Sequence, residues 1–208
     1  MTGNWLERAN RFFELPLELR TRILVLVAAV LLVPSFLFPL YQMTLYSKQF
    51  PDGLVLKIYS YTLEGGHTNN RDDLREINSL NHYIGMRPLL ESDFSEFNWL
   101  PFGIGALVLL ALRAIAFGKM SKLVDLVVLF LYFALFSFWS FGHRLAQYGH
   151  VLDPTAAIKV APFTPPLFGT HQIANFTVNN YPGPASYLIA ASLVLMIVAL
   201  LLSARPTA

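Results

Sequence analysis

The chain has no cysteine among its 208 residues. Disulfide bonds, thiolate metal sites and CxxC redox chemistry are therefore excluded, because each needs a cysteine sulfur. Charged residues are also scarce, at 13% of the chain, where soluble domains carry about 25%. Hydrophobic residues make up 55%, so the composition indicates a membrane protein. The net charge of +2 is too small to indicate a nucleic-acid partner.

Four long apolar runs account for the missing charge. A membrane-spanning helix needs about 20 mainly apolar residues, and four segments provide them. We predict transmembrane helices at residues 23–41, 99–117, 123–142 and 186–203. The second run contains Arg113 near its end, and its long side chain can extend to the membrane surface.

The distribution of Lys and Arg predicts the orientation of these helices. An even number of spans places residues 1–22, 118–122 and 204–208 on one side. That side and the adjoining helix ends carry eight basic and four acidic residues, against seven basic and nine acidic on the other. The eight basic residues are Arg8, Arg11, Arg20, Arg22, Arg113, Lys119, Lys122 and Arg205. Basic residues favour the cytoplasm, so we expect both termini inside and residues 42–98 and 143–185 in the periplasm.

Residues 1–22 have the pattern of an amphipathic helix on the inner membrane surface. One helical stripe is apolar, and it consists of Trp5, Leu6, Ala9, Phe12 and Phe13. Such a helix lies in the membrane interface. It serves either as an anchor that leads into the first span or as a sensor of the membrane surface.

The two outer segments are expected to form one small mixed α/β cap. Residues 54–63 are rich in branched and aromatic residues and predict a strand. A short helix is expected from about Asn70, with Asp72 and Asp73 in its first turn and Gly85 just after its end. The Pro-rich string VAPFTPPL, residues 160–167, favours extended backbone in the second segment. Each segment alone is too small for a stable core.

The membrane interior offers little chemistry. Only Arg113 and Asp125 are charged within the apolar runs, and both lie near the predicted cytoplasmic ends. A proton relay, an ion-coupled transporter and a haem held between two histidines are therefore disfavoured. The motifs GxGxxG, GxxxxGK[ST], GxSxG and HExxH are absent. We accordingly expect a protein that is not an enzyme.

All five histidines fall in the outer segments, namely His67, His82, His143, His150 and His171. Without thiolates, Cu(I) would take imidazole and thioether ligands, and Cu(II) would take imidazole with oxygen. The string LNHYIGM places His82 and Met86 four residues apart, but the helix end expected at Gly85 weakens chelation by adjacent turns. Ordinary hydrogen-bonding roles for these histidines remain open.

Three strings resemble a known family when taken together. They are FPDGLVLKIYSY, INSLNHYIGM, and YGHVLDPTAAIKV followed by FTPPLFGTHQIANF. They are similar to a little-described family of four-helix integral membrane proteins associated with nitrous-oxide-reductase gene clusters, beside copper-delivery and periplasmic maturation components. The matching residues are Asn81, His82, Tyr83, Gly85, Met86, Tyr148, Gly149, His150, Asp153, Pro165 and Pro166. His67, His143 and His171 stand where the family has other residue types.

The resemblance implies a bacterial inner-membrane protein that contributes to copper handling or to the maturation of a periplasmic copper enzyme. Copper is the implied cofactor, with His82 and His150 as imidazole ligands, Met86 as a thioether ligand or a gate, and Asp153 as a carboxylate that orients an imidazole. The expected partners are the lipid bilayer and a membrane or periplasmic protein.

A second hypothesis is a structural or assembly subunit of a respiratory or photosynthetic membrane complex with no bound metal. The predicted third span is rich in aromatic residues that could pack on a partner, namely Phe130, Tyr132, Phe133, Phe136, Phe138 and Trp139. Packing of these rings against lipid is the simpler alternative.

Overall fold

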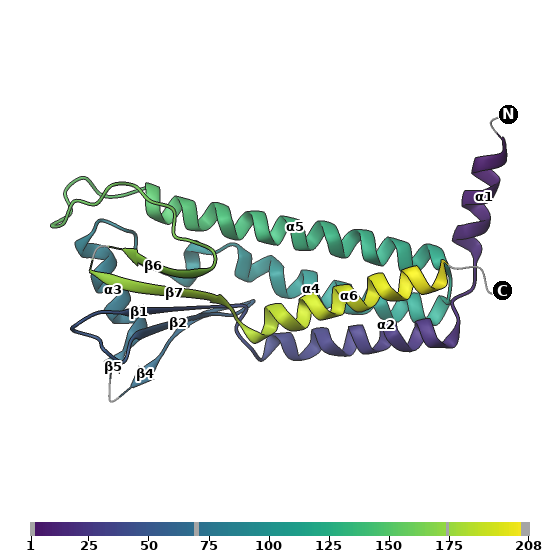
Figure 1. The fold of residues 1–208 in the computed structure, drawn as a ribbon, viewed down its shortest axis with the longest axis horizontal. Helices are drawn as coiled ribbons and strands as arrows, with labels where there is room; N and C mark the ends of the chain where they lie inside the picture. Colours follow the sequence, from purple (N-terminus) through teal and green to yellow (C-terminus); the bar gives the residue numbers. More distant parts are fainter. Residues whose placement is uncertain (1–2, 69–70, 174, 205–208) are drawn as a thin grey trace. The chain divides into compact units, whose positions relative to one another are not determined.

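A computed structural model describes residues 3–68, 71–173 and 175–204 (Figure 1). Asn70 and Arg205, which entered the predictions above, lie outside these ranges. The chain forms two compact units. We call the first the helical unit (Met1–Ser35, Phe102–Leu135 and Tyr187–Ala208) and the second the sheet unit (Phe36–Pro101 and Phe136–Ser186).

Four helices of the described chain are long and apolar enough to cross a membrane. They are α2 (Leu19–Leu32, continued by the 3-10 turn η1, Val33–Phe36), α4 (Glu96–Phe117), α5 (Met120–His150) and α6 (Pro184–Ser203). The predicted number of four spans is confirmed. A shorter helix, α1 (Gly3–Glu14), precedes them.

The ends of three helices differ from the sequence-based boundaries. The predicted helix over residues 1–22 is divided at Pro16, whose ring disfavours helix in the preceding residue. The first span ends at Phe36 instead of residue 41, since Pro39 cannot continue the ladder of helical hydrogen bonds. Helix α5 continues eight residues beyond residue 142 to His150, because Gly142 is tolerated inside a helix at a cost of only about 1 kcal/mol.

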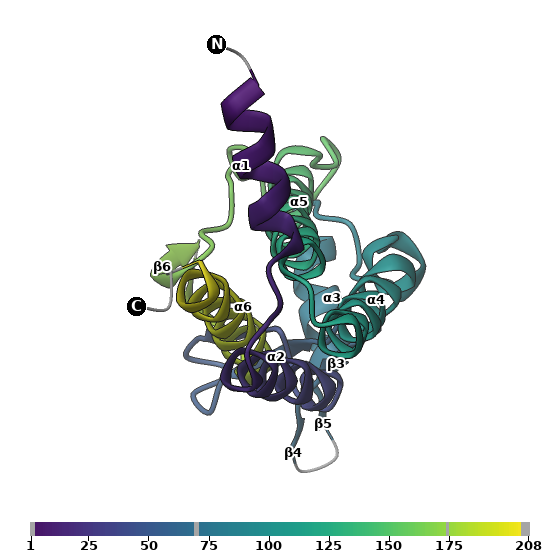
Figure 2. The same cartoon turned by 90° about the vertical axis from the view of Figure 1, so that its right-hand side faces the viewer.

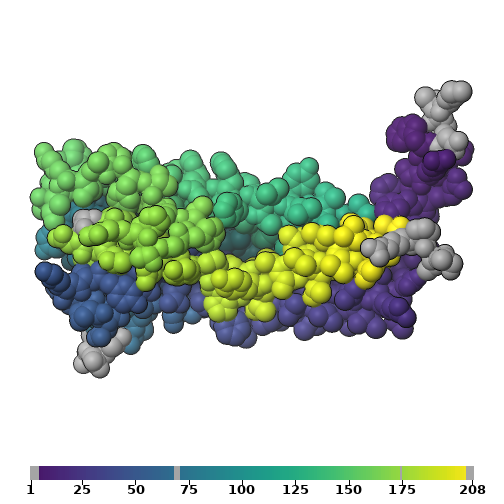
Figure 3. Space-filling model, viewed as in Figure 1, coloured from purple at the N-terminus to yellow at the C-terminus, as the bar shows by residue number. Residues whose placement is uncertain are grey.

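Within the helical unit, α2 and α6 lie side by side (Figures 2 and 3). The Ser192 hydroxyl donates to the carbonyl of Ala28 at 2.8 Å, and the hydroxyls of Thr21 and Ser203 are 2.7 Å apart. Such bonds between helices satisfy polar groups for which a bilayer offers no partner. The turn from α4 to α5 passes through Gly118, whose φ of +59° favours glycine.

The sheet unit contains a five-stranded antiparallel sheet in the order β3-β2-β1-β7-β6. The strands are β1 (Tyr41–Tyr46), β2 (Leu54–Ile58), β3 (Leu63–Gly65), β6 (Gly169–Ile173) and β7 (Phe176–Pro182). Strand β1 pairs with β2 on one side and with β7 on the other, so both long outer segments build the same sheet (Figure 1). This confirms that the two segments fold together.

The strand predicted over residues 54–63 is a hairpin instead of one strand. Strands β2 and β3 are joined by a turn in which the Tyr59 amide donates to the Thr62 carbonyl at 2.8 Å. A second, very short hairpin follows, formed by β4 (His67–Thr68) and β5 (Arg71–Asp72).

Helix α3 (Asp73–Tyr83) packs on this sheet through its predicted apolar stripe. Ile77 is buried, and Leu74 and Leu80 pack against the same core. The buried core residues are Phe50, Leu54, Leu56, Leu63, Ile77, Phe94 and Tyr148. The last two come from the segment before α4 and from the end of α5, so one core combines α3, the sheet and α5.

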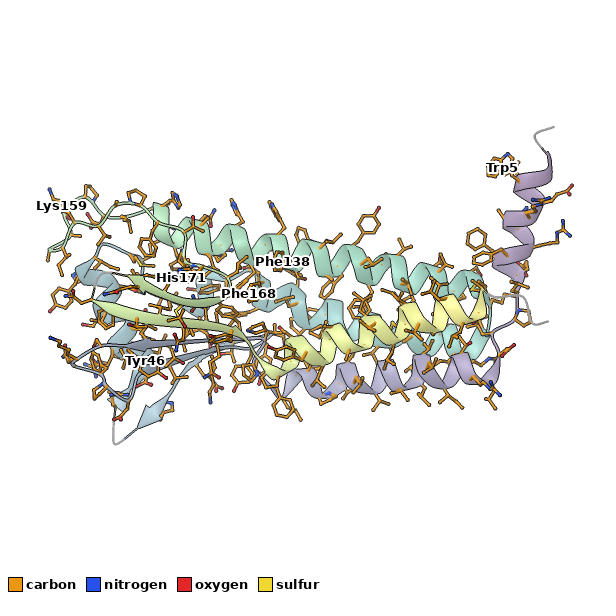
Figure 4. The ribbon with its side chains drawn as sticks, in the orientation of Figure 1. Trp5, Tyr46, Phe138, Lys159, Phe168 and His171 are labelled. Atoms are coloured by element: carbon orange, nitrogen blue, oxygen red, sulfur yellow. The ribbon has the colours of Figure 1, made fainter. Side chains whose placement is uncertain are left out.

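The Pro-rich string of residues 160–167 contains no helix or strand. Two side chains of the sheet hold its end. The Tyr41 hydroxyl donates to the carbonyl of Leu167 at 2.9 Å, and the Asn180 amide donates to that of Pro166 at 2.8 Å. The chain thereby enters β6, and Figure 4 labels His171 of this strand and Phe168, the residue before it.

Candidate functional site

The predicted ligands His82 and Met86 lie at the C-terminal end of α3. Gly85 adopts a φ of +79°, and its amide donates to the His82 carbonyl at 3.2 Å. The Met86 amide donates to the Asn81 carbonyl at 2.8 Å. These two bonds form a Schellman motif, in which glycine ends the helix. The helix end predicted at Gly85 is therefore confirmed.

This motif separates the two predicted ligands. Met86 follows the left-handed residue and packs against the core around Ile77, as the residue at this position of the motif often does. The His82 side chain is exposed. The Met86 side chain packs against apolar residues of the core. Because α3 ends at Tyr83, His82 and Met86 do not lie on adjacent turns of one helix, as the predicted chelate would need.

The loop after α5 is held directly against this helix end. The Asp153 amide donates to the Gly85 carbonyl at 2.8 Å, and the Ile158 amide donates to the Tyr83 carbonyl at 2.9 Å. A Cβ atom added to Gly85 would lie 2.8 Å from the Asp153 carbonyl oxygen. The strings LNHYIGM and YGHVLD of the two outer segments therefore meet, and glycine is required at their closest approach.

The Asp153 carboxylate accepts two hydrogen bonds from Thr155. The Thr155 hydroxyl and amide donate to Oδ1 at 2.6 and 2.8 Å. These bonds lower the pKa of Asp153 below its ordinary value of 3.8, and the positive charge of His82 also lowers it. Among the described residues, the hydrogen-bond donors to the Asp153 carboxylate belong to Thr155, and the orienting role predicted for Asp153 stays a prediction.

His150 lies in the last turn of α5, with its side chain exposed. Its Nδ1 atom is 2.9 Å from the Ala146 carbonyl oxygen. That bond would place a proton on Nδ1 and leave Nε2 as the metal-binding nitrogen. Across residues 3–68, 71–173 and 175–204, no three His, Asp or Glu residues are grouped to hold a metal ion. The metal-binding roles predicted for His82, Met86, His150 and Asp153 stay predictions.

An exposed row of side chains follows one face of α5. Its members are Phe136, Trp139, His143, Gln147 and His150, spaced by three or four residues so that they share one side of the helix. The Trp139 and His143 rings stack with centroids 5.4 Å apart and an interplanar angle of 7°. The Gln147 amide lies 3.1 Å from His143 Nε2. Sequence reasoning missed the polar half of this row because it assigned residues 143–150 to a loop.

A partly buried ion pair lies on another side of α5. Glu96 accepts hydrogen bonds from the Ser140 hydroxyl at 2.7 Å and from Arg144 at 3.0 Å. The Arg144 guanidinium also lies over the Phe94 ring, 5.7 Å from its centroid, and that ring stacks on Tyr148. The pair joins the start of α4 to the end of α5 and thereby orients the exposed row.

No protein-family profile and no curated protein sequence matches this chain.

Proposed function

We propose that this protein is a non-enzymatic accessory subunit that binds a larger respiratory or photosynthetic membrane complex through the exposed row of α5. The observation that carries the proposal is the continuity of this row, from Phe136 and Trp139 to His143, Gln147 and His150 on one rigid helix. Lipid chains solvate the aromatic side chains of Phe136 and Trp139 well, but they offer no hydrogen-bond partner to the polar half of the row. A partner helix that leaves the membrane beside α5 would contact both halves.

One further feature supports an interaction role. The membrane-spanning helices contain no charged pair at mid-depth that would indicate transport. In this proposal the protein lies in a bacterial inner membrane, its termini face the cytoplasm, and the sheet unit faces the periplasm, as the distribution of Lys and Arg predicts.

The test is co-purification from native membranes. Gentle solubilisation followed by native electrophoresis and mass spectrometry should find the protein in a complex of defined stoichiometry. The double variant Trp139→Ala/His143→Ala should release it from that complex. Tyr187→Ala/Leu109→Ala, which removes exposed residues of α6 and α4, is the matched control and should leave the complex intact. A protein that purifies alone and monodisperse would contradict the proposal.

Copper handling is the second candidate, and the specific observation in its favour is that the helix end with the exposed His82 is hydrogen-bonded, through the Gly85 carbonyl, to the Asp153 amide of the other outer segment. Two imidazoles that share one copper ion need their nitrogens within about 4 to 5 Å. The test is the copper content of purified protein after loading and desalting, compared with His82→Ala/His150→Ala. His67→Ala/His171→Ala, which removes two other exposed histidines, is the matched control. Equal copper content in the wild type and the first variant would exclude this candidate.

A further inference from the structure

The sheet unit contains a small cavity next to the exposed row of α5. It has a volume of about 120 Å³ and is lined by Arg87, Asp93, Arg144, Gln147, Tyr148 and Val151. Cavities that enclose drug-sized ligands measure about 300–1,000 Å³. This one can therefore hold only a small group, or the head of a larger molecule.

Two opposite charges line the cavity without pairing. The Arg144 guanidinium is committed to Glu96 at 3.0 Å. Arg87 and Asp93 are both exposed, and among the residues that the structure describes neither has an ion-pair partner within 4.0 Å. The cavity thus presents one cation and one anion, both available to a ligand.

Tyr148, one of the lining residues, carries an unsatisfied polar group. Tyr148 is 8% exposed, and its buried hydroxyl has no hydrogen-bond partner among the described residues. The charges that act on this hydroxyl include those of Asp93, Arg144 and Arg87, which all line the cavity. A buried hydroxyl without a partner is costly, so a ligand that supplies an acceptor would gain affinity from it.

The position along the chain indicates where the ligand comes from. Arg144 and Gln147 follow the predicted membrane boundary at Gly142 by two and five residues, which is about 3 to 8 Å along a helix. The headgroup layer of a bilayer is about 5–8 Å thick on each side. Trp139, one turn before Gly142, has the interfacial position that tryptophan favours.

We propose that this cavity binds a zwitterionic headgroup that combines a phosphate with a primary ammonium, as in phosphatidylethanolamine. Arg87 would bind the phosphate, Asp93 would accept hydrogen bonds from the ammonium, and the Tyr148 hydroxyl would donate to a phosphate oxygen. The headgroup carries one negative and one positive charge, which match the positive charge of Arg87 and the negative charge of Asp93. The net charge of the cavity therefore does not change when the headgroup binds. The acyl chains would remain outside in the bilayer, as the small volume requires.

The test uses the delipidated full-length protein in detergent, to which three lipids are added in competition. Native mass spectrometry should find one bound phosphatidylethanolamine per chain, preferred at least tenfold over phosphatidylglycerol, which lacks the ammonium, and over phosphatidylcholine, whose ammonium cannot donate a hydrogen bond. Arg87→Gln should lower the binding of phosphatidylethanolamine roughly tenfold. Asp93→Asn should instead abolish the preference over phosphatidylglycerol.

Matched variants separate the site from general charge effects. Arg75→Gln and Asp52→Asn alter exposed residues of the same unit outside the cavity and should leave the lipid preference unchanged. Tyr148→Phe keeps the ring and its stacking, so the lipid-free protein should melt at an unchanged or slightly higher temperature while it binds phosphatidylethanolamine more weakly.

The soluble headgroup glycerophosphoethanolamine identifies the source of the ligand. Binding of the intact lipid alone supports a bilayer ligand, and binding of the soluble headgroup with the same dependence on Arg87 and Asp93 supports the same chemistry from solution. Equal retention of the three lipids, or a lipid preference that Arg87→Gln and Asp93→Asn leave unaltered, would overturn the proposal.

Discussion

The buried carboxylate of Asp73 provides the sharpest test of how the sheet unit is held together. Asp73 is 1% exposed. Its Oδ2 accepts the Val55 amide of β2 at 2.9 Å, and its Oδ1 accepts Arg71 Nε at 2.8 Å. Arg71 donates onward to the Gly53 carbonyl at 2.9 Å and lies over the Phe50 ring. One carboxylate thus joins the start of α3 to β2 and to the turn before it.

The cost of removing this carboxylate follows from its burial. Loss of one partner from a buried ion pair costs about 3–5 kcal/mol. The Arg71 side chain is 24% exposed, so water compensates part of the loss, and we expect about 3 kcal/mol for Asp73→Ala. The neighbouring Asp72 is the matched control. It is exposed and caps α3 by accepting the Leu74 amide at 3.0 Å, so Asp72→Ala should cost only about 1 kcal/mol.

Hydrogen–deuterium exchange of purified protein in detergent measures both values. A loss of about 3 kcal/mol corresponds to roughly 150-fold faster exchange, and a loss of about 1 kcal/mol to roughly fivefold. Peptides that cover β2 should show the larger acceleration in Asp73→Ala alone. Peptides from α6, in the helical unit, should be unchanged in both variants. Equal acceleration of β2 in the two variants would refute the assignment of Asp73 as the organising residue.

Three further predictions concern other parts of the molecule. Gly85→Ala should destabilise the docked loop by at least about 1–2 kcal/mol, because of the left-handed backbone and the close approach of Asp153, and faster tryptic cleavage after Lys159 would report it. Since Thr155 lowers the pKa of Asp153, the stabilisation that this carboxylate provides should be complete above about pH 3.8 and should be lost as the pH falls through the lowered value. Exchange in this loop should therefore accelerate on acidification in the wild type but not in Asp153→Asn. Brominated lipids should quench Trp5, which is 64% exposed on α1, in a protein whose other two tryptophans are Phe, and an unquenched Trp5 would show that α1 does not lie on the bilayer (Figure 4).

The parts of the fold that could be predicted are those with a local physical cause. Each span is a run of apolar residues long enough for a bilayer, so its existence follows from length alone. The end of α3 was also predictable, because Gly85 supplies the left-handed conformation that a Schellman motif requires.

The sheet was largely hidden for the opposite reason. Strand β1, YQMTLY, directly continues the apolar run of the first span, and only its pairing with β2 and β7 distinguishes it from more helix. Strand β7, FTVNNYP, contains two asparagines, which are depleted in strands. Asn180 is nonetheless buried there, because its side chain holds the Pro-rich segment.

The candidate site shows the same division. Sequence reasoning placed the LNHYIGM and YGHVLD strings in the same cap, and the structure brings them together through Gly85 and Asp153. It did not anticipate that Met86 would pack into the core, since that core is built from residues of β2, β3, α3 and α5. The cavity next to Tyr148 combines residues of the segment before α4 with residues of α5, and no short-range pattern connects them.

The central position of β1 in the sheet also has a consequence for synthesis. Its partner β7 begins about 130 residues later in the chain. At a translation rate of about 5–20 residues per second, one edge of β1 stays unpaired for roughly 7 to 26 seconds while the chain is made. Exposed edges promote association between chains, so the nascent protein has a period of vulnerability that the finished protein lacks. We expect added chaperones to raise the yield of folded protein, and we expect circular permutants that bring β7 next to β1 in the chain to fold faster.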